Sequence, residues 1–266
     1  QRAMGDLKRA LAAEGMDEAV LWSFTSSEIA QHFGWDRDSQ SDLLLANPIS
    51  ADLDVMRPSL LPNLIMAASR NNDRGYGDVA LFEAGLRFLS TKPDGQLPTV
   101  GGVRMGSAHP RHWAGGARAV DAFDAKSDAL AALAAFGAPV DNLMTDTRDI
   151  PVWFHPGRSG TMRLGKNTLA VFGELHPKAL RALGIKGRMV GFELFLDKVP
   201  PKKGKSGTAK PLLKPSAFQP VKRDFAFIVD ADVSAEKLVK AVRGADKALI
   251  SGVALFDVYV GENVPE

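Results

Sequence analysis

Residues 79–105 read VALFEAGLRFLSTKPDGQLPTVGGVRM, and this stretch decides the fold class. Its apolar runs predict consecutive strands at Val79–Glu83, Leu86–Leu89 and Val100–Met105. A Gly and a Pro-Asp-Gly segment separate these runs, and such residues are typical of turns. Strands joined by short turns pair antiparallel, because a parallel pair needs a crossover of about a dozen residues. The pattern therefore argues against a doubly wound Rossmann sheet.

Helix and strand patterns continue on both sides of this stretch. Apolar residues recur at helical spacing, often between a Ser, Thr or Asp cap and a Gly, and predict helices at residues 3–14, 25–34, 59–72, 121–136 and 177–183. Further strands are predicted at residues 18–24, 43–46, 153–154, 161–164, 168–174 and 189–196. Alternation places Val20, Trp22 and Phe24 on one strand face. Residues 1–197 are thus expected to form an α+β domain, a large antiparallel sheet with flanking helices.

A Lys and Pro rich stretch at residues 198–216 divides the chain. It holds six Lys, four Pro and no acidic residue, so it cannot bury a core and is interpreted as a linker. With those lysines set aside, 27 basic residues stand against 31 acidic ones. The basic pI therefore comes from one segment, and neither flanking part has the basic excess typical of a nucleic-acid binder.

Residues 217–266 have the pattern of a βαβ unit. A strand is predicted at 223–229, a helix runs from the Ser234 cap to Gly244, and a second strand follows at 250–260.

Composition excludes several classes of protein. Without Cys there is no thiolate nucleophile, disulfide or Cys-type zinc site. No apolar run approaches the roughly 18 residues that a membrane span needs, and the first residues lack the order of a signal peptide. A soluble cytoplasmic protein without membrane partners is the default expectation. Because the chain begins with Gln1 and ends at Glu266 after a Gly and Pro rich stretch, it is expected to be a piece of a longer polypeptide.

Two segments partly match the sequence pattern of a nucleotide-binding P-loop. Gly160–Asn167 lacks the Ser or Thr that follows the lysine of a P-loop, and β-rich residues come after it, so a hairpin turn is favoured. Gly204-Lys205-Ser206 lacks the earlier glycine and lies in the linker. Neither is interpreted as a nucleotide site.

Histidines and strand carboxylates offer weaker candidates for chemistry. His109 and His112 have no third ligand nearby, so loop histidines are favoured over a metal pair. His155-Pro156-Gly157-Arg158 combines a titratable group, a turn and a cation, and here too turn architecture is the simpler interpretation. Glu83 and Glu174 lie in apolar strands and are each expected to meet an arginine such as Arg57, Arg87 or Arg158, because an unpaired buried carboxylate is costly.

Six segments in order resemble the β subunits of bacterial phenylalanine–tRNA ligase. They are residues 18–24, 45–50 (LANPIS), 56–62 (MRPSLLP), 81–85 (LFEAG), 154–159 (FHPGRS) and 171–177 (VFGELHP). After the linker, residues 218–224 (FQPVKRD) resemble the start of that family's anticodon-binding domain.

The resemblance implies a class II aminoacyl-tRNA synthetase catalytic-like domain over residues 1–197. In that family the α subunit makes phenylalanyl-adenylate, and the β domain is an inert copy that packs against α in an α2β2 heterotetramer acting on tRNA(Phe). No Arg of this chain is followed two residues later by Glu, and no Gly-x-Gly-x-Gly run precedes an Arg, so the signatures of the class II active site are absent. No catalytic, cofactor-binding or metal-binding residue is therefore expected here, while ATP and Mg²⁺ are implied for the whole complex. Residues at the position of the family's interface motif are expected to serve subunit packing: Arg57, Pro58, Leu60 and Leu61. Glu83, His155, Arg158 and Glu174 are expected to be structural.

The same resemblance makes residues 217–266 the first half of a ferredoxin-like anticodon-binding module. Because that fold places a later strand between the first two, the native sheet is not expected to form from this half. The segment is instead expected to be rearranged, swapped between chains or docked, and anticodon binding to be weak. Lys222 and Arg223 are the candidates for RNA contact, as phosphate ligands.

Two alternatives stay open. One is a free-standing RNA-binding module that uses the lysines of residues 198–216, for which salt-sensitive binding would be the sign. The other is an independent enzyme in which His155, Arg158 and Glu174 converge in one pocket.

Overall fold

The computed structural model describes residues 2–201, 212, 213 and 215–262. The chain forms two units, Gln1–Lys202 and Lys203–Glu266. Most of the predicted linker, including Gly204–Ser206, lies outside the described residues.

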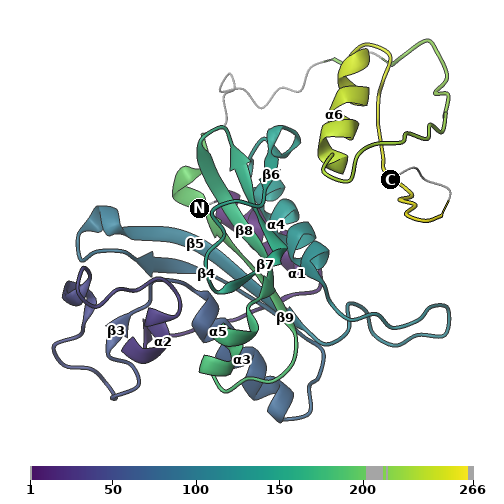
Figure 1. Cartoon of the computed structure of the whole chain (residues 1–266). Coiled ribbons are helices and arrows are strands. Elements are labelled where there is room, and N and C mark those ends of the chain that lie inside the picture. The colour runs from purple at the N-terminus through teal and green to yellow at the C-terminus, as the bar shows by residue number, and fades with distance from the viewer. Residues whose placement is uncertain (1, 202–211, 214, 263–266) are drawn as a thin grey trace. The chain divides into compact units, whose positions relative to one another are not determined.

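A seven-stranded sheet is the centre of the first unit (Figure 1). Its strand order is β1-β4-β5-β9-β8-β7-β6. The strands are β1 (Asp17–Glu18), β4 (Val79–Phe88), β5 (Gln96–Met105), β6 (Met144–Asp146), β7 (Phe154–Leu164), β8 (Asn167–Leu175) and β9 (Met189–Phe195). Every pair is antiparallel except β1 with β4. The predicted antiparallel α+β architecture is confirmed.

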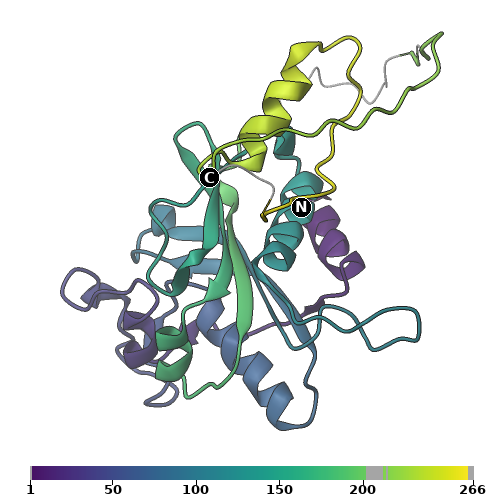
Figure 2. The ribbon, with the colours of Figure 1, turned by 45° about the vertical axis from the view of Figure 1, so that its right-hand side comes forward.

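Helices cover both faces of this sheet. The helices of the first unit are α1 (Arg2–Ala13), α2 (Ser27–Gln31), α3 (Leu61–Asp73), α4 (Ala122–Phe136) and α5 (Pro177–Ala182). One core joins the apolar sides of α1 and α4 to one sheet face, and a second core joins α3 and α5 to the other. Figure 2 shows α1, in purple, beside α4, in teal, on the same side of the sheet. A small third core lies under α2 and the two-stranded sheet of β2 (Phe24–Thr25) and β3 (Val55–Met56).

Local signals account for the helix ends. Asp121 and Asp124 form a reciprocal capping box at the start of α4, and Gly137 ends it in the left-handed conformation, with φ at 103°. Ser26 caps α2 through its side-chain oxygen. Short 3₁₀ helices occur at Ser41–Leu43, Pro93–Gly95, Val140–Asn142 and Leu196–Lys198.

Several predicted strands of the first unit differ from the observed ones. β4 runs unbroken through Gly85, so no turn separates 79–83 from 86–89. β7 is likewise one strand, with register shifts, where two pieces were predicted. The predicted strand at 18–24 is paired only at its two ends, and 43–46 joins the sheet of β2 and β3 through a single bridge at Leu44. β6, a three-residue edge strand, was not predicted.

The described residues of the second unit contain one helix, α6 (Ala235–Ala245), capped by Ser234 as predicted. Residues 223–229 and 250–260 were predicted to be strands, but in the described part of this unit they pair with nothing. A strand needs a hydrogen-bonded neighbour, and these two do not bond to each other. The prediction of strands at these two segments is therefore wrong for the described residues, and a rearranged, swapped or docked arrangement of the segment stays a prediction.

Candidate functional site

A row of three residues crosses the middle of the first unit's sheet. Glu83 of β4 lies opposite Gly101 of β5, which lies opposite Glu193 of β9. Leu60 packs on this row, because a Cβ added to Gly101 would lie 3.1 Å from the Leu60 Cβ. The segment before α3, residues 57–60, therefore lies between two strand glutamates.

Arg57 binds the first of these glutamates. Its Nη1 and Nη2 atoms donate to Glu83 Oε2 and Oε1 at 2.8 and 2.9 Å, and both side chains are buried. Arg57 also donates to the carbonyl oxygens of Leu86 and Trp22, at 3.0 and 3.1 Å. The expectation that Glu83 meets an arginine is confirmed. This bidentate pair joins β4 to the segments before β2 and α3.

Glu193, the second glutamate, is held by neutral donors. Its Oε1 accepts from the Ser59 hydroxyl at 2.8 Å and from the Leu60 amide at 2.9 Å. Burial raises the pKa of Glu193, and the nearby Arg87 and Arg57 lower it less than burial raises it. The sequence interpretation missed this residue, although a Glu inside the apolar run GFELF is the same signal that drew attention to Glu83 and Glu174.

A cavity of about 220 Å³ adjoins Glu193 and residues 57–60. Its lining comes from the loops beside α2 and β7 and from four strands: Phe33, Gly34, Pro58, Ser59, Arg87, Leu89, Asp149, Pro151, Trp153, Thr161, Thr168, Val171, Glu193 and Phe195. The Arg87 Cζ atom lies 4.3 Å from the centroid of the Phe195 ring. Burial lowers the pKa of the Arg87 guanidinium. The Nε atom of Arg87 and the Nε1 atom of Trp153 are buried without a protein hydrogen-bond partner.

ATP with Mg²⁺ does not fit these residues. Pockets for drug-sized ligands and cofactors usually measure about 300–1,000 Å³, and this cavity is smaller. The buried Arg57 and Glu83 are paired with each other, so neither is available to a phosphate or a metal ion. Within the described residues, no three His, Asp or Glu side chains come together as a metal site.

The other predicted structural residues lie at the β7–β8 side of the sheet. Arg158 donates through Nε and Nη2 to Glu174, at 2.6 and 3.0 Å, so Glu174 also meets an arginine as expected. His155 instead accepts from the Gly157 amide and stacks on His176, with ring centroids 6.1 Å apart. Among the described contacts none joins His155 to Glu174, and none of the three residues of the alternative enzyme hypothesis lines the cavity beside Glu193.

The four interface candidates are buried inside this chain. Arg57, Pro58, Leu60 and Leu61 all lie in the interior, so they cannot themselves form a contact surface in this conformation. The exposed apolar residues nearby are Val20 (90%) and Trp22 (62%), which the alternation had grouped as one strand face. Arg57 and Asn63 both hydrogen-bond the Trp22 carbonyl oxygen, at 3.1 and 2.8 Å. The buried arginine therefore positions an exposed apolar segment.

The remaining predicted features lie apart from this row. Gly160–Asn167 spans the β7–β8 turn, with Gly165 at a φ of 59°, so the hairpin turn is confirmed. His109 and His112 lie in the loop between β5 and α4. Lys222 and Arg223 are exposed in the second unit, and their role in RNA contact stays a prediction.

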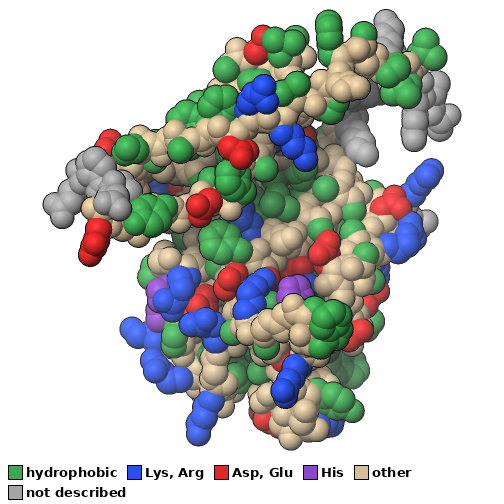
Figure 3. All heavy atoms as spheres, turned by 90° about the vertical axis from the view of Figure 1, so that its right-hand side faces the viewer, with side chains coloured by type: hydrophobic (Ala, Val, Ile, Leu, Met, Phe, Trp, Pro, Cys, Tyr) green, Lys and Arg blue, Asp and Glu red, His purple; other side chains and the backbone are tan. Residues whose placement is uncertain are grey.

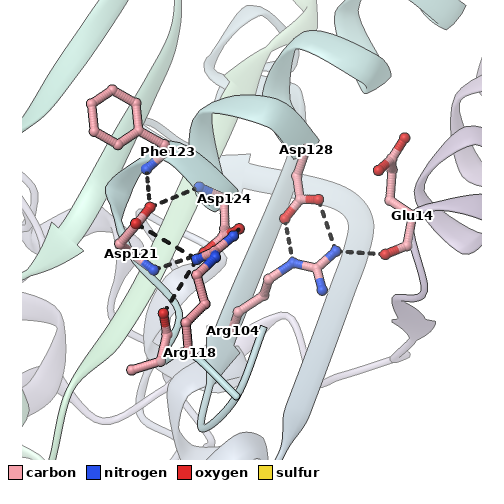
Figure 4. Close-up of polar contacts among 8 residues, drawn as sticks. Glu14, Arg104, Arg118, Asp121, Phe123, Asp124 and Asp128 are labelled. Atoms are coloured by element: carbon pink, nitrogen blue, oxygen red, sulfur yellow. Dashed lines mark hydrogen bonds and ion pairs between the residues drawn. The ribbon is translucent and has the colours of Figure 1, made fainter. Parts of the chain in front are cut away.

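Two further ion pairs hold α4 against β5 and the loop that follows it (Figure 4). Arg104 of β5 binds both carboxylate oxygens of Asp128 and the Glu14 carbonyl oxygen. Arg118 binds Asp124 in the same bidentate way. The first pair joins β5 to α4, and the second joins the loop between them to the start of α4.

No helix in the described part of the chain is long and apolar enough to cross a membrane.

Comparison with known proteins covers both units. The family model "Phenylalanyl tRNA synthetase beta chain CLM domain" matches residues 1–196, and "Ferredoxin-fold anticodon binding domain" matches residues 216–266. A solved structure of Desulfitobacterium hafniense PylSc, a pyrrolysyl tRNA synthetase, is 17% identical with a TM-score of 0.53, over 73% of this chain and 65% of that one. At that identity it shows a shared fold alone.

Curated relatives match the chain almost end to end. The phenylalanine–tRNA ligase β subunit of Rhodospirillum rubrum is 54% identical over 99% of this chain and 32% of the relative. The β subunit of Paramagnetospirillum magneticum is 52% identical over 99% of this chain and 33% of the relative. The chain thus spans about a third of the length of these relatives. With the model match over residues 1–196, these identities show that the chain belongs to the phenylalanine–tRNA ligase β-subunit family.

Proposed function

We propose that this chain serves phenylalanine–tRNA ligase as a non-catalytic, class II synthetase-like domain that packs against an α subunit, followed by part of the anticodon-binding module. The division is residues 1–197, a linker at 198–216, and residues 217–266. Family matches at 1–196 and 216–266 support it. The whole protein would attach phenylalanine to tRNA(Phe) with ATP and Mg²⁺ bound by other parts of an α2β2 complex in the cytoplasm.

The paired charges at the centre of the sheet carry the proposal that the domain is inert. Catalysis of adenylate formation needs cationic groups directed at phosphate oxygens. Here the Arg57 guanidinium donates its hydrogen bonds to Glu83 and to two carbonyl oxygens. Ser59 and Leu60 donate to Glu193. Arg57, Ser59 and Leu60 thus bind other parts of this chain, which supports a structural role for the segment that they form.

Val20 and Trp22 are the proposed contact with the α subunit. Exposed apolar side chains on a fixed backbone are suited to an interface, since burying them releases water without ordering the segment further. Arg57 and Asn63 supply that fixing through the Trp22 carbonyl oxygen. The earlier interface candidates thus take a supporting role in this proposal.

Co-purification with the α subunit, followed by phenylalanine-dependent pyrophosphate exchange, tests this function. We expect the chain to bind α and to show no exchange alone. Trp22→Ser should weaken binding at least tenfold, as loss of a central aromatic anchor does. The matched control is Met144→Ser, which removes an exposed apolar side chain from β6, at the opposite edge of the sheet from β1. Exchange by the chain alone, or equal losses from both variants, would contradict the proposal.

Lys222 and Arg223 are proposed to contact tRNA phosphates. Both side chains are exposed, which supports such a role. A phosphate contact adds salt-dependent affinity without base preference.

A further inference from the structure

The loop between β5 and α4 carries the most exposed tryptophan of the described residues. Trp113 is 99% exposed, so both faces of its indole are open to solvent. The loop is a hairpin, residues 107–119, closed by bridges between Ser107 and Ala119 and between His112 and Gly115. Nothing in the family match or in the proposed α contact assigns a role to it.

The base of this hairpin is anchored. The Ala108 amide donates to the Arg118 carbonyl oxygen at 2.9 Å, and the Val120 amide donates to that of Gly106 at 3.0 Å. Arg118 itself is bound to Asp124 at the start of α4 (Figure 4). In Figure 1 the hairpin projects from the sheet beyond β5. The tip is therefore presented from a fixed base without being packed.

Only basic and neutral side chains surround the tryptophan in sequence. Residues 95–120 contain no Asp or Glu, and the tip holds Arg111 and His112 beside Trp113. These three residues border an open depression of about 620 Å³, together with Gly115, Gly116 and Ala117. The lower part of Figure 3, seen from the side to which the hairpin projects in Figure 1, shows basic side chains together with acidic and hydrophobic ones.

An exposed aromatic face beside a guanidinium, in an acid-free segment, matches the chemistry of unpaired nucleotides. A base stacks on the aromatic ring and a phosphate pairs with the cation, largely without regard to sequence. A protein partner would also bury Trp113, but the flanking Arg111 favours a polyanion, and the acids that meet the hairpin, Asp78 and Asp124, lie at its base, bound to the Ser107 amide and to Arg118.

We propose that the hairpin of residues 107–119 binds an unpaired segment of RNA, with Trp113 stacking on a base and Arg111 contacting a phosphate. The hairpin lies outside residues 217–266 in the sequence and shares no residue with the Val20 and Trp22 surface. RNA binding by the hairpin does not depend on the proposed function, and only the identification of that RNA as tRNA rests on it.

Titration of the whole chain with a 12-nucleotide oligouridylate tests the proposal. The chain should carry Lys202→Ala, Lys203→Ala and Lys205→Ala, which remove three of the six lysines of residues 198–216 and so lower their contribution to RNA binding. In this background, intrinsic tryptophan fluorescence should be quenched on binding, and Trp113→Phe should remove most of the quenching while keeping most of the affinity. Trp113→Ala should weaken binding about tenfold, in line with the loss of one base stack. Arg111→Ala should lower the salt slope by about one.

Two control variants match these changes in kind. Phe123→Ala removes an exposed aromatic ring from the first turn of α4, and Arg181→Ala removes an exposed arginine from α5, on the opposite sheet face. Each should change affinity less than twofold. A tRNA(Phe) transcript in place of oligouridylate should respond to the same variants in the same order.

Unchanged binding by Trp113→Ala and Arg111→Ala would overturn the proposal. It would also be overturned if Trp113→Ala weakened capture of the α subunit and left RNA binding intact, since the tryptophan would then be a protein anchor. The RNA titration contains no α subunit. Its result can therefore be interpreted even if the chain fails to bind α in the co-purification test.

Discussion

Two buried glutamates in one row of the sheet are held in different ways. Glu83 and Glu193 flank Gly101 on neighbouring strands, and both are almost fully buried. Glu83 receives two bonds from the Arg57 guanidinium, whereas Glu193 receives one from a hydroxyl and one from a backbone amide. A buried carboxylate can be matched by a cation or, less completely, by neutral donors, and in the second case burial raises its pKa.

One short segment serves both glutamates. Arg57, Ser59 and Leu60 are nearly consecutive, yet their donors reach carboxylates on two different strands. The row therefore joins β4 and β9 to the start of α3. Substitutions at the Glu83 end and at the Glu193 end should change the free energy of unfolding in different ways.

The largest effect is expected from Arg57→Met, which leaves Glu83 buried without its cation. Breaking a buried ion pair in this way costs about 3–5 kcal/mol of the free energy of unfolding. Urea denaturation followed by circular dichroism measures the loss. Arg57→Met combined with Glu83→Leu should be less destabilised than the single variant, because no orphan carboxylate remains.

Arg158→Met provides the control for that change. The Arg158 side chain is 49% exposed, and Glu174 keeps Arg188 at 3.6 Å, so water and the second arginine compensate for the loss. Equal destabilisation by Arg57→Met and Arg158→Met would show that burial does not distinguish the two pairs.

A smaller effect is expected from Gly85→Ala, which disturbs the same pair without removing a charge. The new Cβ would lie 2.5 Å from Arg57 Nη2, so the guanidinium must shift away from Glu83. Overpacking of this kind costs about 1–3 kcal/mol. Gly157→Ala in β7 is the matched control, since the nearest atom there is 3.7 Å from the new Cβ. If both variants unfold at the same urea concentration, the close approach at Gly85 has no energetic consequence.

The smallest effect concerns Glu193 and depends on pH. Because its pKa is raised in the folded state, the folded chain keeps a proton that the unfolded chain releases as pH rises above about 4.5. This contribution to stability is complete below the unfolded pKa and is lost as pH rises through the folded pKa. Glu193→Gln keeps an acceptor for Ser59 and Leu60 but cannot titrate. Its stability relative to the unchanged chain should therefore increase from pH 4 to pH 8, as measured by urea midpoints. A difference that is constant with pH would remove Glu193 as the titrating group.

Features that depend on neighbouring residues were the most predictable. The Asp121 cap, the Gly137 stop and the β7–β8 turn at Gly165 all follow from residues a few positions apart. The need of Glu83 and Glu174 for arginine partners also follows from their apolar surroundings. The sequence offered three candidate arginines, and only the fold assigned Arg57 to one carboxylate and Arg158 to the other.

Features that depend on what covers a strand were not predictable. Alternation grouped Val20 with Trp22, but no local signal says whether another element packs on that side, and both residues are exposed. Residues 223–229 and 250–260 have strand composition but pair with nothing among the described residues.

The amino-acid sequence by itself determined the helices of the first unit, the caps of α4 and the β7–β8 turn, because these depend on residues a few positions apart, and its turn signals also indicated the antiparallel α+β class. Only the tertiary structure decided that β4 continues through Gly85, that Arg57 is interior, and that Glu193 belongs to the same row. Ser59 and Glu193 are 134 residues apart, and strand register with helix packing, rather than local spacing, brings them together.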